Sequence, residues 1–216
     1  MNNKEVEMQT VELFCGTKSF SMVAKGLGYD IFTTDIESKF NPDLVADILN
    51  LSAKDFPNNV DILWASPPCN CFSVASIGKY WNKDYTPKTE ISQKALLLLQ
   101  HTIGLIKEIN PTCFIIENPR AMMRKLPIMQ QFNRHTVTYC QYGEQYMKPT
   151  DLWSNIQLDL KPPCKNGSSC HISAPRGSKK GVQGIKGKVE RGKVPQELCR
   201  SILDQITKRW RCGIDR

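Results

Sequence analysis

Short apolar runs that end in polar or turn-forming residues recur along the first half of this 216-residue chain. Each has the length of a buried strand, and helical or turn-rich stretches separate them. They cover residues 10–14, 31–35, 44–47, 61–65 and 112–117. Strands that alternate with helices in this way build a parallel sheet with crossover connections. We therefore expect an α/β fold around a mostly parallel sheet.

The clearest helix is expected over residues 91–109, between the fourth and fifth of these strands. Leu99 and Ile103 belong to a set of apolar residues at helical spacing, and Pro111 stops the pattern. The strand that follows is thus connected to its predecessor by a long crossover helix, as a parallel pair requires.

The second half of the chain is less regular. Residues 137–142 and 151–157 are typical of two later strands. Residues 161–192 are rich in Gly, Lys, Pro and Ser, which predicts a long loop or a small irregular module without its own core. From Pro195 an amphipathic helix follows. We accordingly divide the chain into a core over 1–160, a basic module or loop over 161–193, and a helix over 194–216 that packs back on the core.

Positive charge is concentrated at the C-terminal end. Residues 161–216 hold 14 Lys and Arg against 4 Asp and Glu, whereas residues 1–160 hold 15 against 17. A basic segment on a near-neutral body suits binding to a phosphate backbone, and the alternative is a solvated tail that aids solubility.

Other compositional features indicate a cytoplasmic protein. No apolar run reaches the roughly 18 residues of a membrane span, and acidic residues stand near the start, where a signal peptide would be apolar. The nine cysteines are odd in number and partly inside apolar strands, so we expect reduced thiols. No feature indicates a particular oligomeric state.

A cysteine stands where an open α/β sheet presents its chemistry. Cys69 follows Pro67-Pro68, directly after the strand expected at 61–65. A thiol at the carboxyl end of a buried strand can act as a nucleophile. The alternative is a structural thiol beside a turn; Cys71 is the competing cysteine, and we assign it to packing.

The first strand ends in a glycine turn, which suits a nucleoside cofactor. Gly16 lets the backbone approach the ligand, and Asp35 and Asp47 follow the next two strands, where a carboxylate can accept ribose hydroxyls. Both aspartates can also simply open turns. Lys18 occupies the second glycine position of a dinucleotide fingerprint, so NAD is disfavoured.

Taken together, these motifs resemble those of the DNA cytosine-5 methyltransferases that use S-adenosylmethionine. The similar segments are 11–21, 34–37, 46–48, 67–73, 116–119, 142–148 and 194–195, so the resemblance spans nearly the whole chain. The Ser-Pro-Pro-Cys and Glu-Asn-Pro variants, the segment 148–155, and Cys170-His171 followed by 174–177 resemble a compact group of such enzymes that is often seen in phages.

The resemblance implies a Rossmann-like methyltransferase sheet, with the catalytic core in residues 1–160. It implies S-adenosylmethionine as cofactor. The expected cofactor-binding residues are Phe14, Cys15, Gly16, Thr17, Lys18, Ser19, Asp35, Ile36, Asp47, Ile48 and Pro67. Lys18 and Ser19 stand where the family usually has glycine, which would narrow the cofactor site or place an ammonium beside the cofactor's carboxylate.

The resemblance also implies the catalytic roles. Cys69 would add to carbon 6 of cytosine, so that carbon 5 becomes nucleophilic toward the methyl group, and a base would then remove the carbon 5 proton. Glu117 would hold the Watson-Crick edge of the base and place a proton or hydrogen bond on nitrogen 3. Lys148 replaces the family's arginine and would bring positive charge to the same pocket.

The implied partner is DNA, from which the target base must be flipped. The candidates for phosphate contact are Arg176, Lys179, Lys180, Lys186, Lys188 and Arg191. Two alternatives remain: an RNA cytosine-5 methyltransferase using the same thiolate chemistry, and a catalytically silent DNA-binding protein that keeps the fold, for which Lys18 is the main argument. The short basic module predicts a brief recognised sequence or low specificity.

A second cysteine cluster is of the kind that binds zinc. Cys164, Cys170 and His171, together with Cys140, offer ligands to a module that lacks a core and would gain stability from a metal. Their spacing is not the paired Cys-x-x-Cys type, so the alternative is free thiols with a surface histidine.

Overall fold

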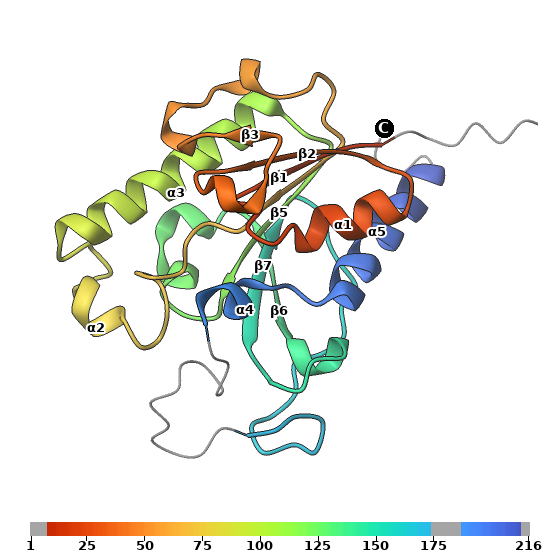
Figure 1. Cartoon of the computed structure of the whole chain (residues 1–216). Coiled ribbons are helices and arrows are strands. Elements are labelled where there is room, and N and C mark those ends of the chain that lie inside the picture. Colours follow the sequence, from red (N-terminus) through yellow and green to blue (C-terminus); the bar gives the residue numbers. More distant parts are fainter. Residues whose placement is uncertain (1–7, 174–186, 213–216) are drawn as a thin grey trace, which may run out of the picture.

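In the computed structural model, which describes residues 8–173 and 187–212, the chain forms one sheet with helices on both faces (Figure 1). The strands run in the order β3-β2-β1-β4-β5-β7-β6. They are β1 (Gln9–Leu13), β2 (Asp30–Asp35), β3 (Leu44–Val45), β4 (Ile62–Ala65), β5 (Cys113–Pro119), β6 (Asn133–Thr138) and β7 (Pro149–Ser154). The first five in this order pair in parallel, and β7 is antiparallel to both neighbours. The expected α/β fold with a mostly parallel sheet is confirmed.

Two hydrophobic clusters sandwich the sheet because its central strands are buried on both faces. In β4, Ile62 and Trp64 join one cluster, whereas Leu63 and Ala65 join the other. This alternation is what a period of two residues gives a strand in the middle of a parallel sheet. The helices are α1 (Ser19–Gly26), α2 (Ile77–Tyr80), α3 (Glu90–Ile109), α4 (Lys188–Gly192) and α5 (Gln196–Arg211). Figure 1 shows α3 on one side of the sheet and α1 with α5 on the other.

The strands expected before residue 118 and the helix expected over 91–109 lie within two residues of their observed bounds. The two later strands differ more, since the strand expected over 137–142 begins at Asn133 and the strand expected over 151–157 is Pro149–Ser154. The strand expected over 137–142 is wrong beyond Thr138, because residues Tyr139–Tyr142 form a 3-10 helix. Tyr139 and Tyr142 are both buried, and a three-residue repeat places two such side chains on one face. The strand expected over 44–47 is shorter than expected, since Asp47 accepts a hydrogen bond from the Leu49 N–H and begins a 3-10 helix.

The first helix, α1, has no side-chain cap at its N-terminus. Lys18, the residue before α1, has a left-handed backbone with φ 58°, and no side chain at that position accepts a hydrogen bond. Instead, Glu12 on β1 accepts the Ser21 N–H at 2.8 Å. Glu12 is 3% exposed, and this burial raises its pKa from 4.5 to about 7. A strand carboxyl group therefore supports the turn that leads from β1 into α1.

This carboxyl group makes stability depend on pH. Its pKa is higher in the folded protein than in the unfolded chain, so the stabilisation is complete below about pH 4.5 and is lost as pH rises through about 7. The loss approaches about 3 kcal/mol. We expect Glu12→Gln to remove most of it, as measured by urea denaturation at about pH 5 and about pH 8. Glu108→Gln, a change on the exposed face of α3, is the control and should keep the full dependence. Equal dependence in the Glu12 and Glu108 variants would contradict the assignment.

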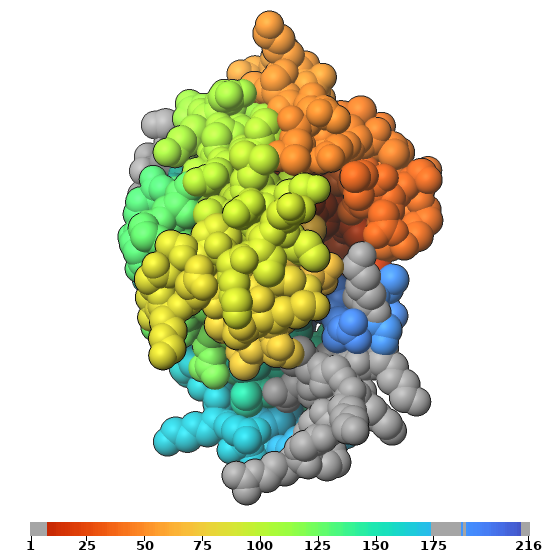
Figure 2. Space-filling model, turned by 90° about the vertical axis from the view of Figure 1, so that its left-hand side faces the viewer, coloured from red at the N-terminus to blue at the C-terminus, as the bar shows by residue number. Residues whose placement is uncertain are grey.

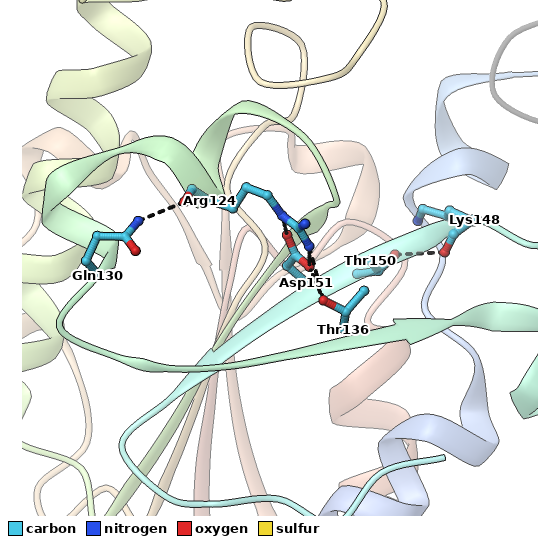
Figure 3. A network of polar contacts seen from close by, with 6 residues as sticks. All are labelled: Arg124, Gln130, Thr136, Lys148, Thr150 and Asp151. Carbon is cyan, nitrogen blue, oxygen red and sulfur yellow. Dashed lines mark hydrogen bonds and ion pairs between the residues drawn. The ribbon is translucent and has the colours of Figure 1, made fainter. Parts of the chain in front are cut away.

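The antiparallel edge is held by a buried ion pair (Figure 3). Asp151 on β7 is fully buried and accepts hydrogen bonds from Arg124 Nε at 2.8 Å and from Thr136 Oγ1 at 2.8 Å. Gln130 Nε2 donates to the Arg124 carbonyl at 2.7 Å. The network ties the segment after β5 to β6 and β7, and so fixes the strand that starts beside Lys148.

None of the helices in the described part of the chain is long and apolar enough to cross a membrane.

Candidate active site

The predicted nucleophile lies between two strand ends. Pro67 and Pro68 follow β4, and the Asn118 side chain of β5 donates to the Pro67 carbonyl at 2.8 Å. Asn118 is fully buried, so this bond fixes the proline loop to the neighbouring strand. Downstream, Trp81 Nε1 donates to the Cys71 carbonyl at 2.7 Å. The loop that carries Cys69 is therefore anchored on both sides.

Glu117 extends from the same edge, one residue before Asn118. It is 5% exposed, and its Oε1 accepts a hydrogen bond from the Tyr139 hydroxyl at 3.1 Å. Tyr139 is fully buried and precedes Cys140 in the 3-10 helix that follows β6. The sequence analysis did not identify Tyr139, because its partner on β5 is 22 residues away along the chain.

Lys148 lies against the Tyr139 ring, and the Glu117 charge acts on it. Its Nζ stands 4.4 Å from the centre of the Tyr139 ring and donates to the backbone carbonyls of Arg191 at 2.7 Å and Lys193 at 3.4 Å. Burial lowers its pKa, and the charges of Glu117 and Cys69 oppose that change. Lys148 therefore joins the catalytic edge to the segment around α4.

The pKa of the Cys69 thiol depends on the charges of both Glu117 and Lys148. Burial raises its pKa above the usual value, the Glu117 carboxylate raises it further, and the Lys148 ammonium lowers it. The thiolate form of Cys69 is favoured only to the extent that the Lys148 ammonium offsets the effects of burial and of the Glu117 carboxylate. The charges of Glu117 and Lys148 both act on the Cys69 thiol, so the three predicted catalytic residues lie near one another at this edge of the sheet.

A cavity of about 290 Å³ opens beside this edge. In Figure 2 it is the recess between the yellow-green atoms of α3 and the orange atoms that follow β2. Its lining residues are Phe14, Thr34, Asp35, Ile36, Ala46, Asp47, Ile48, Leu49, Pro68, Lys94, Ala95 and Leu98. It therefore lies at the carboxyl ends of β1, β2 and β3, where open α/β sheets bind nucleotides.

The chemistry of this cavity fits a nucleoside cofactor. Asp35 bridges the first two strands, since its two carboxylate oxygens accept the N–H groups of Gly16 and Glu37, each at 2.9 Å. Ile36 is 63% exposed, so its apolar surface is available to a flat ring. A carboxylate beside an apolar wall suits a ribose and its attached base.

Five of the eleven predicted cofactor residues line the cavity, namely Phe14, Asp35, Ile36, Asp47 and Ile48. Cys15, Gly16, Thr17, Lys18, Ser19 and Pro67 are outside its lining. The sequence analysis missed the wall from α3, formed by Lys94, Ala95 and Leu98. Their spacing of three and four residues on one helix face was the available signal.

Lys18, which was expected to narrow the cofactor site or to place an ammonium beside the cofactor's carboxylate, lies outside the lining of this cavity. Its ammonium donates to the Asn41 carbonyl, and the residue is not part of the cavity lining. The left-handed backbone explains why glycine suits this position, since only glycine adopts it without steric cost. Lys18 therefore substitutes for glycine with its side chain held outside the cavity.

The four predicted metal ligands come together around the end of β6. Cys140 Sγ lies 3.1 Å from Cys164 Sγ and 3.7 Å from Cys170 Sγ. His171 Nδ1 lies 3.7 Å from Cys164 Sγ and 3.6 Å from Cys170 Sγ. All four ligand atoms lie within 4.8 Å of one another. The structure thus forms the Cys3His cluster that the spacing alone left open.

Of the predicted phosphate contacts, Arg191 is in α4, and its charge lowers the pKa of Cys69. Lys188 begins the same helix. Arg176, Lys179, Lys180 and Lys186 lie outside the described residues.

Comparison with known proteins identifies the family. Residues 8–135 match the C-5 cytosine-specific DNA methylases. A curated relative from Frog virus 3 (isolate Goorha), named as a probable DNA (cytosine-5)-methyltransferase, is 28% identical over 216 residues, which cover 91% of this chain and 99% of the relative.

Solved structures agree in fold. A DNA modification methyltransferase encoded within an E. coli prophage matches with a TM-score of 0.51 and 18% identity over 72% of this chain. The Entamoeba histolytica methyltransferase EhMeth matches with a TM-score of 0.52 and 12% identity over 74%. This chain spans about half of these two proteins, 49% and 58% of their lengths. The chain belongs to the C-5 cytosine-specific DNA methylases, enzymes that transfer a methyl group from S-adenosylmethionine to carbon 5 of cytosine in DNA.

Proposed function

We propose that Cys69, Glu117 and Lys148 carry out this reaction through a covalent adduct between Cys69 and the target cytosine. One observation carries the proposal. A thiol, a carboxylate and an ammonium from three separate segments come close together at the carboxyl ends of β4 and β5, beside the cavity lined by Asp35 and Pro68. A nucleophile with an acid and a compensating cation is what addition to a pyrimidine ring requires.

Cys69 and Glu117 act at two different atoms of the cytosine ring. The Cys69 thiolate forms a bond from Sγ to carbon 6, while Glu117 holds a proton at nitrogen 3, so the electron pair of the 5,6 double bond becomes available at carbon 5. S-adenosylmethionine, when bound, supplies the methyl group that carbon 5 receives. A base then takes the carbon 5 proton, and the electron pair left on the ring re-forms the 5,6 double bond as the bond from Sγ to carbon 6 breaks. Cys69 leaves as a thiolate, and nitrogen 3 returns its proton to Glu117.

Lys148 supports the nucleophile by charge. Its ammonium lowers the pKa of Cys69, which burial and Glu117 raise. The two backbone carbonyls from the α4 segment hold the ammonium in place, so its charge is directed at the pocket without a planar guanidinium.

We propose that the cavity beside α3 holds S-adenosylmethionine. Asp35 and Asp47 would accept hydroxyl groups of the ribose, and Ile36, Pro68 and Leu98 would contact the base. Cys15, Gly16, Thr17 and Ser19 form the turn that shapes the end of β1 rather than the cavity wall. Thr17 and Ser19 hydrogen-bond each other at 3.1 Å, and Ser19 Oγ accepts the Val194 N–H at 3.2 Å.

DNA is the proposed substrate, and the basic residues of the C-terminal segment are proposed to contact its phosphates. Arg191, which the structure describes, lies close enough to the catalytic edge for its charge to act on Cys69. We further propose that the Cys3His cluster is a structural zinc site, whose ion takes no chemical part in the reaction. A cytoplasmic location remains a prediction from the sequence, and for a phage-encoded chain this would be the cytoplasm of the bacterial host cell.

Labelling with tritiated S-adenosylmethionine tests the substrate. The protein is incubated with cytosine-containing duplex DNA or with transfer RNA, and each nucleic acid is hydrolysed to measure labelled 5-methylcytosine. We expect label in DNA. Label in RNA alone would identify the RNA methyltransferase alternative, and no label in either would favour the silent DNA-binding protein.

A further inference from the structure

The residues Thr138, Tyr139 and Cys140 face two sites at once. Tyr139 points inward and donates its hydroxyl to Glu117 at 3.1 Å. Its neighbours face the loop that carries the other metal ligands: Thr138 Oγ1 accepts the Cys164 N–H at 2.9 Å, and Cys140 Sγ lies 3.1 Å from Cys164 Sγ. One short backbone segment thus forms part of the catalytic pocket and part of the Cys3His cluster.

The geometry of the cluster suits zinc. A tetrahedral zinc ion with bonds of about 2.3 Å to sulfur places its ligands about 3.8 Å apart. The separations of 3.6 and 3.7 Å at Cys170 and His171 agree with this edge, and the shorter pair at Cys140 and Cys164 needs only a small opening. The thiols are free, so they are available as ligands.

The ligand loop has little else to hold it. Residues 160–173 form no helix or strand, and Ile172 is 68% exposed. Apart from the cluster, the loop is joined to the segment after β6 by a few hydrogen bonds, such as those from the Ile172 N–H to the Gln145 carbonyl at 2.7 Å and from the Lys161 N–H to the Tyr142 hydroxyl at 2.9 Å. A segment without an apolar core depends on a metal for its position.

We propose that zinc at Cys140, Cys164, Cys170 and His171 fixes Tyr139 against Glu117, so that metal occupancy sets the rate of methyl transfer. This inference rests on the zinc site proposed above. Tyr139 is a positioning residue: it holds Glu117 through one hydrogen bond, and its ring supports the Lys148 ammonium. The cofactor cavity shares none of these residues, so cofactor binding is independent of the metal.

Metal content tests the first step. Elemental analysis of the freshly purified full chain should find about one zinc per chain. Cys164→Ser should lose most of the zinc. Cys212→Ser changes an exposed cysteine outside the cluster and should keep both zinc and activity. Absence of zinc from the unchanged protein would overturn the metal site itself.

A double-mutant cycle tests the coupling. We expect Cys164→Ser and Tyr139→Phe each to lower kcat by about tenfold, the effect of a lost hydrogen bond to a charged group, with the KM for S-adenosylmethionine unchanged. Tyr139→Phe should keep its zinc. If the metal acts through Tyr139, the double variant should also lose about tenfold, because the two changes remove the same contact.

A loss of about 100-fold in the double variant would show independent effects and overturn the coupling while leaving the zinc site intact. Removal of zinc from the unchanged protein by a chelator, followed by its return, gives a second measurement that needs no substitution. Here kcat should fall and recover in the unchanged protein and stay at its reduced value in Tyr139→Phe. Equal responses in both proteins would also overturn the coupling.

Discussion

Cys69→Ser should abolish methyl transfer, with kcat lower by about 1,000-fold or more, because a serine hydroxyl at neutral pH is far less ionised and less nucleophilic than a thiol. DNA binding should persist, since the basic residues that we propose as phosphate contacts are unchanged. The measurements are tritium transfer from S-adenosylmethionine and a gel-shift titration with the same duplex. Substantial methylation by this variant would remove Cys69 from the mechanism.

Cys71→Ser is the matched control for this experiment. Cys71 is two residues from Cys69 but is 4% exposed, and its Sγ contacts the Ile91 carbonyl at 3.8 Å. The Cys71→Ser variant should keep most of the methyl-transfer activity of the unchanged protein. A duplex with 5-fluorocytosine at the target position completes the comparison, because fluorine at carbon 5 blocks the final elimination. The unchanged protein and Cys71→Ser should form a complex that survives denaturation, and Cys69→Ser should form none.

Glu117→Gln should change two measurements in opposite directions. Methyl transfer should fall by about 100-fold or more, because the amide cannot deliver a proton to nitrogen 3. Alkylation of Cys69 by iodoacetamide should become faster at neutral pH, because the Glu117 charge raises the pKa of Cys69. Mass spectrometry of the peptide that contains Cys69 separates its reaction from that of the other thiols.

Lys148→Gln is the opposing variant. Loss of its charge should raise the pKa of Cys69 and slow alkylation, since the ammonium lowers that pKa in the unchanged protein. In each protein alkylation should quicken as pH rises, and the pH of half-maximal rate should be lowest for Glu117→Gln and highest for Lys148→Gln. The same pH in all three proteins would mean that these charges do not act on Cys69.

The sheet could be predicted from the sequence because each of its central strands has a recognisable local pattern of residues. The run Ile62-Leu63-Trp64-Ala65 is apolar throughout, as a strand buried on both faces must be. The region after β6 could not be predicted in the same way. Tyr139 and Tyr142 have the apolar surface of strand residues, and only the turn at Gly143, with φ 90°, makes a 3-10 helix the better solution.

The residues of the site also divide into those that the sequence predicts and those that it does not. Cys69 and Glu117 could be predicted because Cys69 follows closely after β4 and Glu117 lies near the end of β5. The partner of Glu117 could not be predicted, since Tyr139 meets it only when β7 pairs between β5 and β6, an arrangement that no local pattern specifies. The wall that α3 gives to the cavity could not be predicted either. The sequence pattern of this helix identifies its apolar face, whereas Lys94, which lines the cavity, is a polar residue.

The packing of α5 on α1 has a consequence for biosynthesis. Residues Leu198 and Ile202 share a hydrophobic cluster with Phe20 and Val23, and the Val194 N–H bonds to Ser19 beside the first glycine turn. During translation α1 is therefore made uncovered, and the helix that covers it follows only after about 170 further residues. Such long-range closure makes folding slow, so a cofactor-competent enzyme forms only after translation of this helix, never on a partial chain.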